Sequence, residues 1–137
     1  RSSKNATLNP AVGSINNVTF ENIVATDMTQ TYGSYISGVS TLGGTFKLTN
    51  LLFKNVDLTF KGGSTNFGAQ PEFNASNNNE YPDPGPTSLF PNKKDMPGYL
   101  YFRHADNITL INTNVTVSPV DTRQKIVTED VTNYTNN

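Results

Sequence analysis

The 137-residue sequence contains no cysteine, no tryptophan and only one histidine. Without cysteine, the chain itself forms no disulfide, no catalytic thiolate and no cysteine-ligated zinc site. With one histidine, it cannot supply a metal site built from several histidines.

Charge is also scarce and balanced. Lys and Arg total 10 and Asp and Glu total 11, so that charged residues make up 15% of the chain, against about 25% in an average domain. A near-neutral chain lacks the clustered cations that neutralise phosphates. No apolar run approaches the ~18 residues of a membrane helix. We therefore expect neither a nucleic-acid partner nor a membrane span.

Asparagine and threonine are abundant instead, with 19 and 18 residues. Leu, Ile, Val and Phe together total 33 of 137 residues, about 24%, which is above the ~20% below which disorder becomes the default. Three stretches share one pattern: an Asn, apolar residues at positions +1 and +3, a second Asn at +5, and further alternation. They begin at Asn17, Asn50 and Asn107, and a fourth begins at Asn133, at spacings of 33, 57 and 26 residues. Repeats of this length are typical of solenoids and propellers.

The alternation within each copy predicts β-strands with one buried face. Asparagine suits the bends between short strands, because it tolerates the left-handed backbone region and bonds to its own backbone. We therefore predict an all-β chain folded as a parallel β-helix, with Phe20, Phe53 and Leu110 stacked in one row. The predicted inward residues are Val18, Phe20, Ile23, Ala25, Leu51, Phe53, Val56, Leu58, Phe60, Ile108, Leu110, Val115 and Val117.

One long loop insertion interrupts the repeats. Residues 62–98 contain 5 Gly, 6 Pro and 6 Asn, a composition typical of a loop. Loops longer than about 12–15 residues are often functional. A functional loop and a lateral decoration without chemistry remain equal alternatives at this point.

Several segments resemble, in order, the bacterial-type polygalacturonase-like enzymes of glycoside hydrolase family 28. The most specific segment runs from Met96 to Leu110 and reads Met-Pro-Gly-Tyr-Leu-Tyr-Phe-Arg-His-Ala-Asp-Asn-Ile-Thr-Leu. The other segments are residues 15–25, 51–56, 61–63, 81–83, 119–123 and 129–131. The resemblance covers roughly residues 12–133, and it implies a right-handed parallel β-helix.

The same resemblance implies inverting hydrolysis by aspartates, whose carboxyl groups lie about 6.5–9.5 Å apart. The family's signatures Asn-Thr-Asp, Asp-Asp, Gly-His-Gly and Arg-Ile-Lys do not occur in this sequence. Glu129-Asp130 is the only acidic dipeptide, and neighbouring strand residues point to opposite faces. We therefore expect no catalytic residue, metal or cofactor here. Residues 1–137 are expected to be the C-terminal coils of a single, incomplete β-helix domain, with the catalytic coils upstream.

Two aromatic or titratable residues remain candidates for a role in a site. Tyr35 falls where some family members place a substrate-contacting tyrosine, and is therefore our candidate substrate-binding residue; a packing role is the alternative. His104 is either a catalytic base or, as we favour, a structural residue that bonds to the backbone at a corner of a coil.

The basic residues leave similar alternatives open. Lys47, Lys54 and Lys61 are either a uronate-binding cluster or, as we favour, separate solvated lysines. Arg103 and Arg123 either pair with nearby aspartates (Asp106 and Asp121) or hold the loop.

Six Asn-x-Ser/Thr sequons occur. In a eukaryotic secretory context these are N-glycosylation acceptors, and we expect modification at Asn5, Asn74 and Asn133. Asn17 and Asn107 are first of all corners of the repeat.

The resulting expectation is the C-terminal part of a secreted, extracellular or periplasmic polygalacturonase-like hydrolase that acts on pectin-type polysaccharide. Its partners would be the polysaccharide and the remaining coils of the same protein, with self-association through open β-helix ends. The alternatives are a structural or adhesive β-helix glycoprotein without catalysis and, less favoured, a polysaccharide-binding module.

Overall fold

The computed structural model describes residues 13–41, 44–70 and 94–137, and all of its regular elements are strands. In chain order they are β1 (Asn16–Ala25), β2 (Ser34–Ser37), β3 (Val39–Thr41), β4 (Gly44–Phe46), β5 (Leu48–Lys61), β6 (Gly98–Ser118) and β7 (Gln124–Asn136). The prediction of an all-β chain is confirmed.

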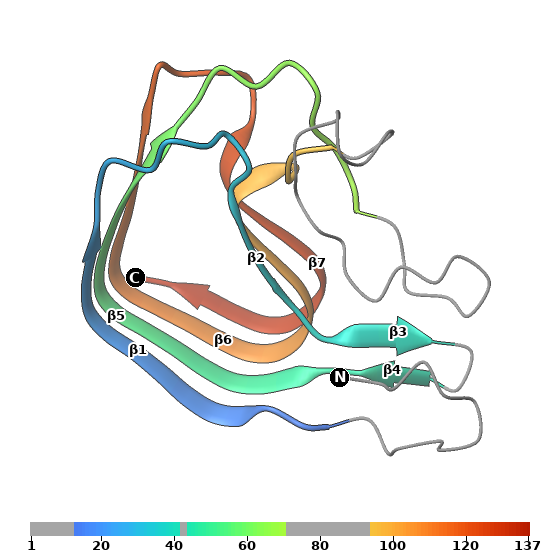
Figure 1. The fold of residues 1–137 in the computed structure, drawn as a ribbon. Coiled ribbons are helices and arrows are strands. Elements are labelled where there is room, and N and C mark those ends of the chain that lie inside the picture. The colour runs from blue at the N-terminus through green and yellow to red at the C-terminus, as the bar shows by residue number, and fades with distance from the viewer. Residues whose placement is uncertain (1–12, 42–43, 71–93) are drawn as a thin grey trace.

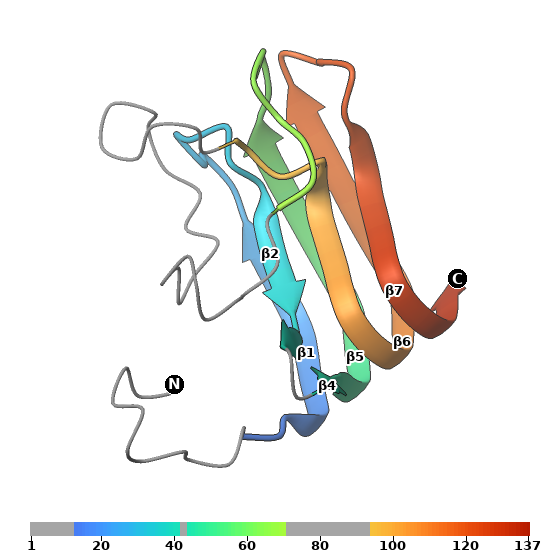
Figure 2. The ribbon, with the colours of Figure 1, turned by 90° about the vertical axis from the view of Figure 1, so that its right-hand side faces the viewer.

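Five of the strands form one parallel sheet that curls around an apolar interior (Figure 1). β6 pairs along one edge first with β2 and then with β5, and along its other edge with β7; β1 pairs with β5. Figure 2 shows β1, β5, β6 and β7 side by side in that order. The small antiparallel hairpin β3–β4 connects β2 to β5.

The repeats stack in register, as the sequence predicts. Phe20 pairs with Phe53, and Phe53 with Leu110. The rings of Phe20 and Phe53 are stacked, with centroids 4.6 Å apart and planes 16° apart. The predicted row across three copies is therefore confirmed.

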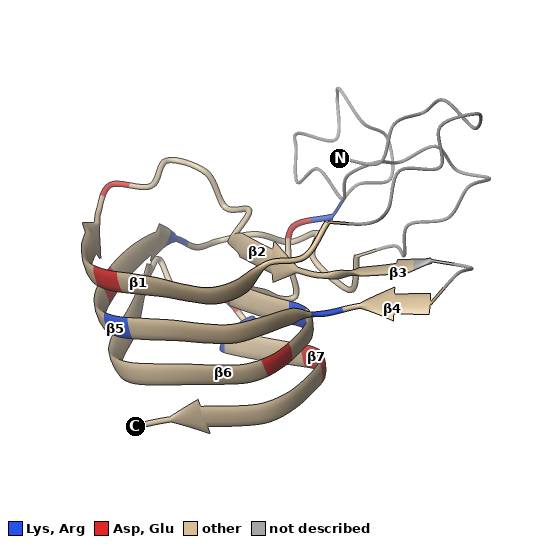
Figure 3. Cartoon of the chain, turned by 90° about the horizontal axis from the view of Figure 1, so that it is seen from below, with Lys and Arg blue, Asp and Glu red and all other residues tan. Residues whose placement is uncertain are grey.

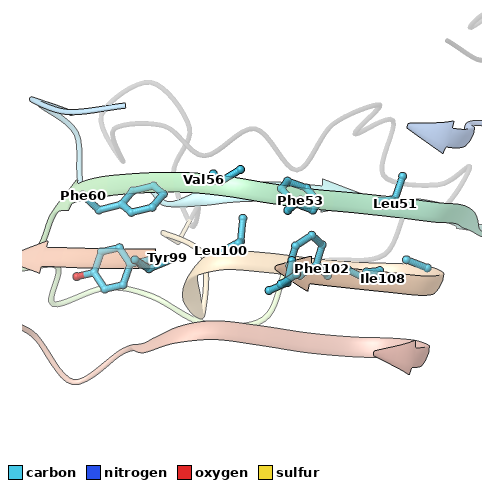
Figure 4. Packing of buried hydrophobic residues seen from close by; sticks show 11 residues of the cluster. Leu51, Phe53, Val56, Phe60, Tyr99, Leu100, Phe102 and Ile108 are labelled. Atoms are coloured by element: carbon cyan, nitrogen blue, oxygen red, sulfur yellow. The ribbon is translucent and has the colours of Figure 1, made fainter. Parts of the chain in front are cut away.

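The inward residues form the core. Leu51, Phe53, Val56 and Phe60 of β5 lie against Tyr99, Leu100, Phe102 and Ile108 of β6 (Figure 4). The ring of Phe102 meets that of Phe53 edge-on, with centroids 5.3 Å apart. Most inward residues of β5 and β6 are buried, whereas the inward residues of β1 are only partly so.

The strands differ from the prediction in one respect: they run on through their bends as long ladders instead of ending at each corner. Left-handed backbone angles occur within β1, β5, β6 and β7 at seven asparagines, among them Asn55 (φ 54°) and Asn112 (φ 49°). At such a residue the in-and-out alternation of side chains shifts by one position. Phe53 and Val56, which lie three positions apart on either side of Asn55, are therefore both buried. The asparagines therefore bend the sheet without interrupting its hydrogen bonding.

Segments at the ends of the 62–98 insertion are described, whereas residues 71–93 lie outside the described residues. Gln70 donates from Nε2 to the carbonyl oxygens of Gly68 and Lys94, at 3.2 and 3.1 Å. Phe67 forms an isolated parallel bridge with Asp95. The two described ends of the insertion are thus fastened to each other beside the sheet.

Candidate functional site

The outer face of β2, β6 and β7 carries the polar cluster that we consider as a candidate site. Register places Tyr35 beside Tyr101, and Ser37 beside Arg103 and then Glu129. Alternation turns Tyr101 and Arg103 away from the core side chains Leu100 and Phe102. Below we call Tyr35, Tyr101, Arg103 and Glu129 the outer strip.

Arg103 organises the outer strip. Its side chain is 4% exposed, and its Nη2 lies 3.0 Å from Oε1 of Glu129. Its Nη1 donates to the carbonyl oxygen of Gln70 at 2.9 Å. Burial alone would lower the pKa of Arg103, but its side-chain hydrogen bond with Tyr35 and the nearby Glu129 charge raise it. Arg103 is therefore a permanent cation that holds both the strip and one end of the insertion.

Two tyrosine rings complete the strip. The Tyr101 hydroxyl donates to Oε2 of Glu129, and burial together with this hydrogen bond raises the pKa of Tyr101 well above its ordinary value. The ring of Tyr35 lies 5.2 Å from that of Tyr101 at an interplanar angle of 33°. Tyr101 is fully buried, whereas Tyr35 is partly exposed. Tyr35 is thus the more exposed residue of this pair.

The next position along these strands is a corner that holds His104, Asp130 and Lys47. His104 and Asp130 both have left-handed backbone angles, of 47° and 48°. His104 Nδ1 lies 2.7 Å from Oδ2 of Asp130, and Lys47 Nζ lies 2.9 Å from Oδ1. The hydrogen bonds from His104 and Lys47 lower the pKa of Asp130. His104 lies at the expected corner, and its Nδ1 contacts the carboxylate of Asp130 there.

A second network lies in the turn between β6 and β7, around Asp121 and Arg123, and includes Tyr99 at the start of β6. The Arg123 side chain is fully buried, and its Nη2 lies 2.8 Å from Oδ2 of Asp121. Its guanidinium carbon lies 4.1 Å from the centroid of the Tyr99 ring. Arg123 also donates to the carbonyl oxygen of Thr31 at 2.6 Å. This single side chain therefore joins the β1–β2 connection to β6 and to the turn before β7.

Asp121 accepts hydrogen bonds from several groups besides Arg123. The backbone amides of Gly63 and Ser64 donate to it at 3.0 and 3.1 Å, and the Tyr99 hydroxyl donates at 2.6 Å. Burial alone would raise the pKa of Asp121, but the hydrogen bonds from Arg123 and Tyr99 lower it strongly. Burial and the bond to Asp121 in turn raise the pKa of Tyr99 to about 12. Asp121 is thus a structural anion that ties the start of the insertion to the turn before β7.

Glycine is required where the insertion begins. A β-carbon on Gly62 would lie 1.8 Å from the carbonyl oxygen of Pro119, and Gly63 has a φ of 86°. A side chain at Gly62 would collide with the backbone, and one at Gly63 would be strained. The glycine pair therefore lets the chain pass close to the turn that carries Asp121.

The cluster has a definable chemical capability. Glu129 and Asp130 are adjacent in sequence but have different partners, since Glu129 bonds to Arg103 and Tyr101 whereas Asp130 bonds to His104 and Lys47. With its lowered pKa, Asp130 is ionised at neutral pH and cannot serve there as a general acid. The ring of Tyr35 can instead stack on a sugar ring, and the carboxylate and hydroxyl oxygens beside it can accept hydrogen bonds from the sugar hydroxyls.

The structure places the remaining predicted residues as follows. Lys54 pairs with Glu21 at 2.7 Å on the outer face of β5 and β1, far along the sheet from Lys47, and Lys61 is exposed at the end of β5. Charged residues are sparse along these strands (Figure 3). The three lysines do not form a cluster.

The structure also places both arginines and one of the three candidate glycosylation sites. Arg123 pairs with Asp121, whereas Arg103 pairs with Glu129 and holds Gln70. Asn133 is exposed at a bend of β7 and donates to Oδ1 of Asp106 at 2.9 Å. The other two candidate glycosylation sites, Asn5 and Asn74, lie outside the described residues.

Sequence reasoning missed Tyr101, Glu129 and Gln70 as members of this cluster. The alternation in residues 99–103 could have placed Tyr101 with Arg103 on one face. Glu129 and Gln70 could not have been found, because they join the cluster only through the pairing of β6 with β7 and the return of the insertion.

Within residues 13–41, 44–70 and 94–137, no three acidic or histidine side chains are grouped so as to hold a metal ion. The same part of the chain contains no helix with the length and hydropathy needed to cross a membrane. Comparison of the chain with family models, with curated proteins and with solved structures gives no match.

Proposed function

We propose that this chain is the C-terminal part of a secreted, polygalacturonase-like glycoside hydrolase that acts on pectin-type polysaccharide by inverting hydrolysis. In this proposal residues 1–137 belong to a right-handed parallel β-helix and supply scaffold and the outer wall of the substrate cleft. The carboxylates that perform hydrolysis belong to other coils. The protein would be located outside the cell or in the periplasm.

Three features support the proposed fold. Equivalent asparagines and apolar residues lie beside one another in successive parallel strands. The parallel strands curl around one core. Crossovers between parallel strands of one sheet are right-handed in about 98% of cases, which favours the right-handed form.

The observation that carries the functional proposal is the outer strip. Tyr35 presents a partly exposed ring, and behind it Arg103 and Glu129 form a fixed polar network. Aromatic rings beside fixed hydrogen-bonding groups suit sugar rings. Tyr35 also occupies the place where the resemblance implies contact with substrate.

The test is to measure binding of pectic oligosaccharides to the chain by isothermal titration calorimetry, and release of reducing ends from polygalacturonate. We expect binding without hydrolysis. Tyr35→Ala should weaken binding about tenfold or more, and Tyr35→Phe should retain part of it because the ring remains. Tyr134→Ala removes an exposed ring from the far end of β7 and should leave binding unchanged. Hydrolysis by this chain, or equal affinities of Tyr35→Ala and the unmodified chain, would contradict the proposal.

A structural or adhesive β-helix glycoprotein is the second candidate. It is favoured by the way in which Glu129, Asp130 and Asp121 are each held by a cation of the same chain, which makes them good scaffold residues. Absence of glycan binding in the same titration would favour this candidate.

A further inference from the structure

In the outer strip and at the corner beside it, the carboxylates are more exposed than the cations that hold them. The Arg103 side chain is 4% exposed, whereas that of its partner Glu129 is 41% exposed. At the corner, the Lys47 side chain is 27% exposed and that of Asp130 is 44% exposed. A ligand that approaches this outer face therefore meets more carboxylate surface than cationic surface.

Arg103 already has partners for both of its terminal nitrogens. Its Nη2 lies 3.0 Å from Oε1 of Glu129, and its Nη1 donates to the carbonyl oxygen of Gln70 at 2.9 Å. A guanidinium binds a carboxylate best through two parallel N–H···O bonds. A sugar carboxylate would have to displace Glu129 from Arg103, and two negative charges would then lie side by side. Arg103 is therefore poorly placed to bind a negatively charged sugar.

Lys47 is shared between carboxylates in a similar way. Its Nζ lies 2.9 Å from Oδ1 of Asp130. A hydrogen bond from Thr132 lowers the pKa of Asp106, and the charge of Lys47 lowers it further. Lys47 thus lies in the field of two carboxylates, and a third carboxylate would gain little from it.

Lys94 and Lys125 are exposed lysines on neighbouring segments. Lys125 lies on β7, four residues before Glu129, which is a separation of about 13 Å along a strand. Exposed charges more than about 10 Å apart are largely screened at moderate salt concentration. The Lys94 side chain lies beside Gly68 in the insertion. We therefore assign neither lysine to the outer strip.

The rest of this surface suits an uncharged sugar. Register places Tyr35 and Val127 on either side of Tyr101 in one row, and both are partly exposed. Such a row can cover the apolar face of a sugar ring or a methyl group. The carboxylate of Glu129, in the neighbouring row, accepts hydrogen bonds from sugar hydroxyls.

We infer that the outer strip takes uncharged sugar units, represented in pectin by methyl-esterified galacturonate, in preference to ionised galacturonate. Esterification removes the sugar charge that Glu129 and Asp130 repel, and it adds a methyl group that can contact Tyr35 or Val127. The inference rests on the proposed function, since it names the form of pectin that the same site binds.

The test is isothermal titration calorimetry of the chain with trigalacturonate and with its fully methyl-esterified form. We expect the ester to bind about fivefold or more tightly, because two like charges about 4 Å apart in water cost about that factor. Raising the salt concentration should tighten binding of the free acid and leave the ester unchanged, because salt screens the repulsion. Tyr35→Ala should weaken binding of both ligands.

Matched variants test the source of the preference. Glu129→Gln keeps the shape of the side chain but leaves the charge of Arg103 uncompensated, so the free acid should bind at least as tightly as the ester. Glu21→Gln removes a similarly exposed carboxylate that pairs with Lys54 on the outer face of β1 and β5, and it should leave the preference unchanged.

A second variant changes the charge without touching Arg103. Asp130→Asn removes the carboxylate at the corner, and asparagine readily adopts the φ of 48° found there. It should reduce the preference for the ester in the same direction as Glu129→Gln. This variant tests the inference even if Glu129→Gln does not fold.

Each contrary outcome has a distinct meaning. Equal or tighter binding of the free acid by the unmodified chain would overturn the inference, but would leave the proposed function standing if that binding depends on Tyr35. A preference for the ester that persists unchanged in both Glu129→Gln and Asp130→Asn would also overturn the inference alone. Absence of binding of either ligand would overturn both the inference and the proposed function.

Discussion

Arg123 shows what one buried side chain does for this fold. Its guanidinium pairs with Asp121, packs on the Tyr99 ring and donates to Thr31. Removing one partner of a buried ion pair leaves an uncompensated charge, which costs far more than the pair itself contributes.

We predict that Arg123→Met lowers the free energy of unfolding by about 3–5 kcal/mol, because Asp121 is left buried without its cation. Chemical denaturation measures this loss. Lys125→Met removes an exposed cation two residues further on and should change stability little. The double variant Arg123→Met/Asp121→Asn should recover part of the loss, and failure to do so would contradict the electrostatic explanation.

The same carboxylate predicts a dependence of stability on pH. The pKa of Asp121 is strongly lowered in the folded chain, whereas an unfolded aspartate titrates near pH 3.9. A lowered folded pKa contributes stability that is fully present above the unfolded pKa and is lost as pH falls toward the folded one. We therefore expect unfolding free energy to fall steadily below about pH 4, as measured by denaturation at several pH values.

Asp121→Asn should make the unfolding free energy fall less steeply in acid, while lowering stability at neutral pH. Asp27→Asn, at an exposed bend with a φ of 56° that asparagine also adopts, is the matched control. If the unfolding free energy falls equally steeply in acid for Asp121→Asn and for the unmodified chain, Asp121 is not the cause of this pH dependence.

At the scale of single strands, the corner asparagines have two separable roles. They adopt a left-handed backbone, and their side chains link neighbouring strands. The first role costs other L-residues roughly 1–2 kcal/mol, and a hydrogen bond of the second kind contributes about 1 kcal/mol.

Substitutions at Asn107 separate these roles. Its φ is 58° and its amide donates to Asn50. We predict that Asn107→Ala lowers the unfolding free energy by about 2–3 kcal/mol, the sum of both effects. Asn107→Gly should lose only about 1 kcal/mol, because glycine accepts the left-handed backbone. Thermal or chemical denaturation of the two variants measures the difference, and equal losses would show that the backbone angle is not limiting.

The repeat pattern predicted the bends and the inward rows because both depend on local rules. An asparagine at a fixed position marks the bend, and alternation marks the buried face, as Phe53 and Leu110 confirm. The position of β2 could not be predicted in this way. This strand of four residues carries no repeat motif, and its partner in β6 lies more than 60 residues further along the chain.

At the scale of the whole molecule, the stack is most stable in its middle. The buried cluster lies mainly on β5 and β6, whereas inward residues of β1 and β7 are only partly buried. Segments with fewer buried apolar contacts open at lower free energy.

Native-state hydrogen exchange should therefore follow the order of the sheet. We expect the backbone amides of β5 and β6 to exchange slowest, and those of β1 and β7 at least about tenfold faster, since a difference of 1.4 kcal/mol in opening free energy corresponds to that ratio. Mass spectrometry of peptides from the four strands measures it. Uniform protection across all four strands, at concentrations where the chain is monomeric, would contradict this view of the stack.

The sequence by itself determined the strands that carry the repeat, their bends and the apolar row through Phe20, Phe53 and Leu110, because alternation and left-handed asparagines act over a few residues. The tertiary structure alone decided the candidate site. Arg103 meets Glu129 and Gln70, and His104 meets Asp130, only after strands distant in sequence pair and the insertion returns. The sequence allows each charged side chain several partners of opposite charge. The register of the paired strands decides which partner lies within bonding distance.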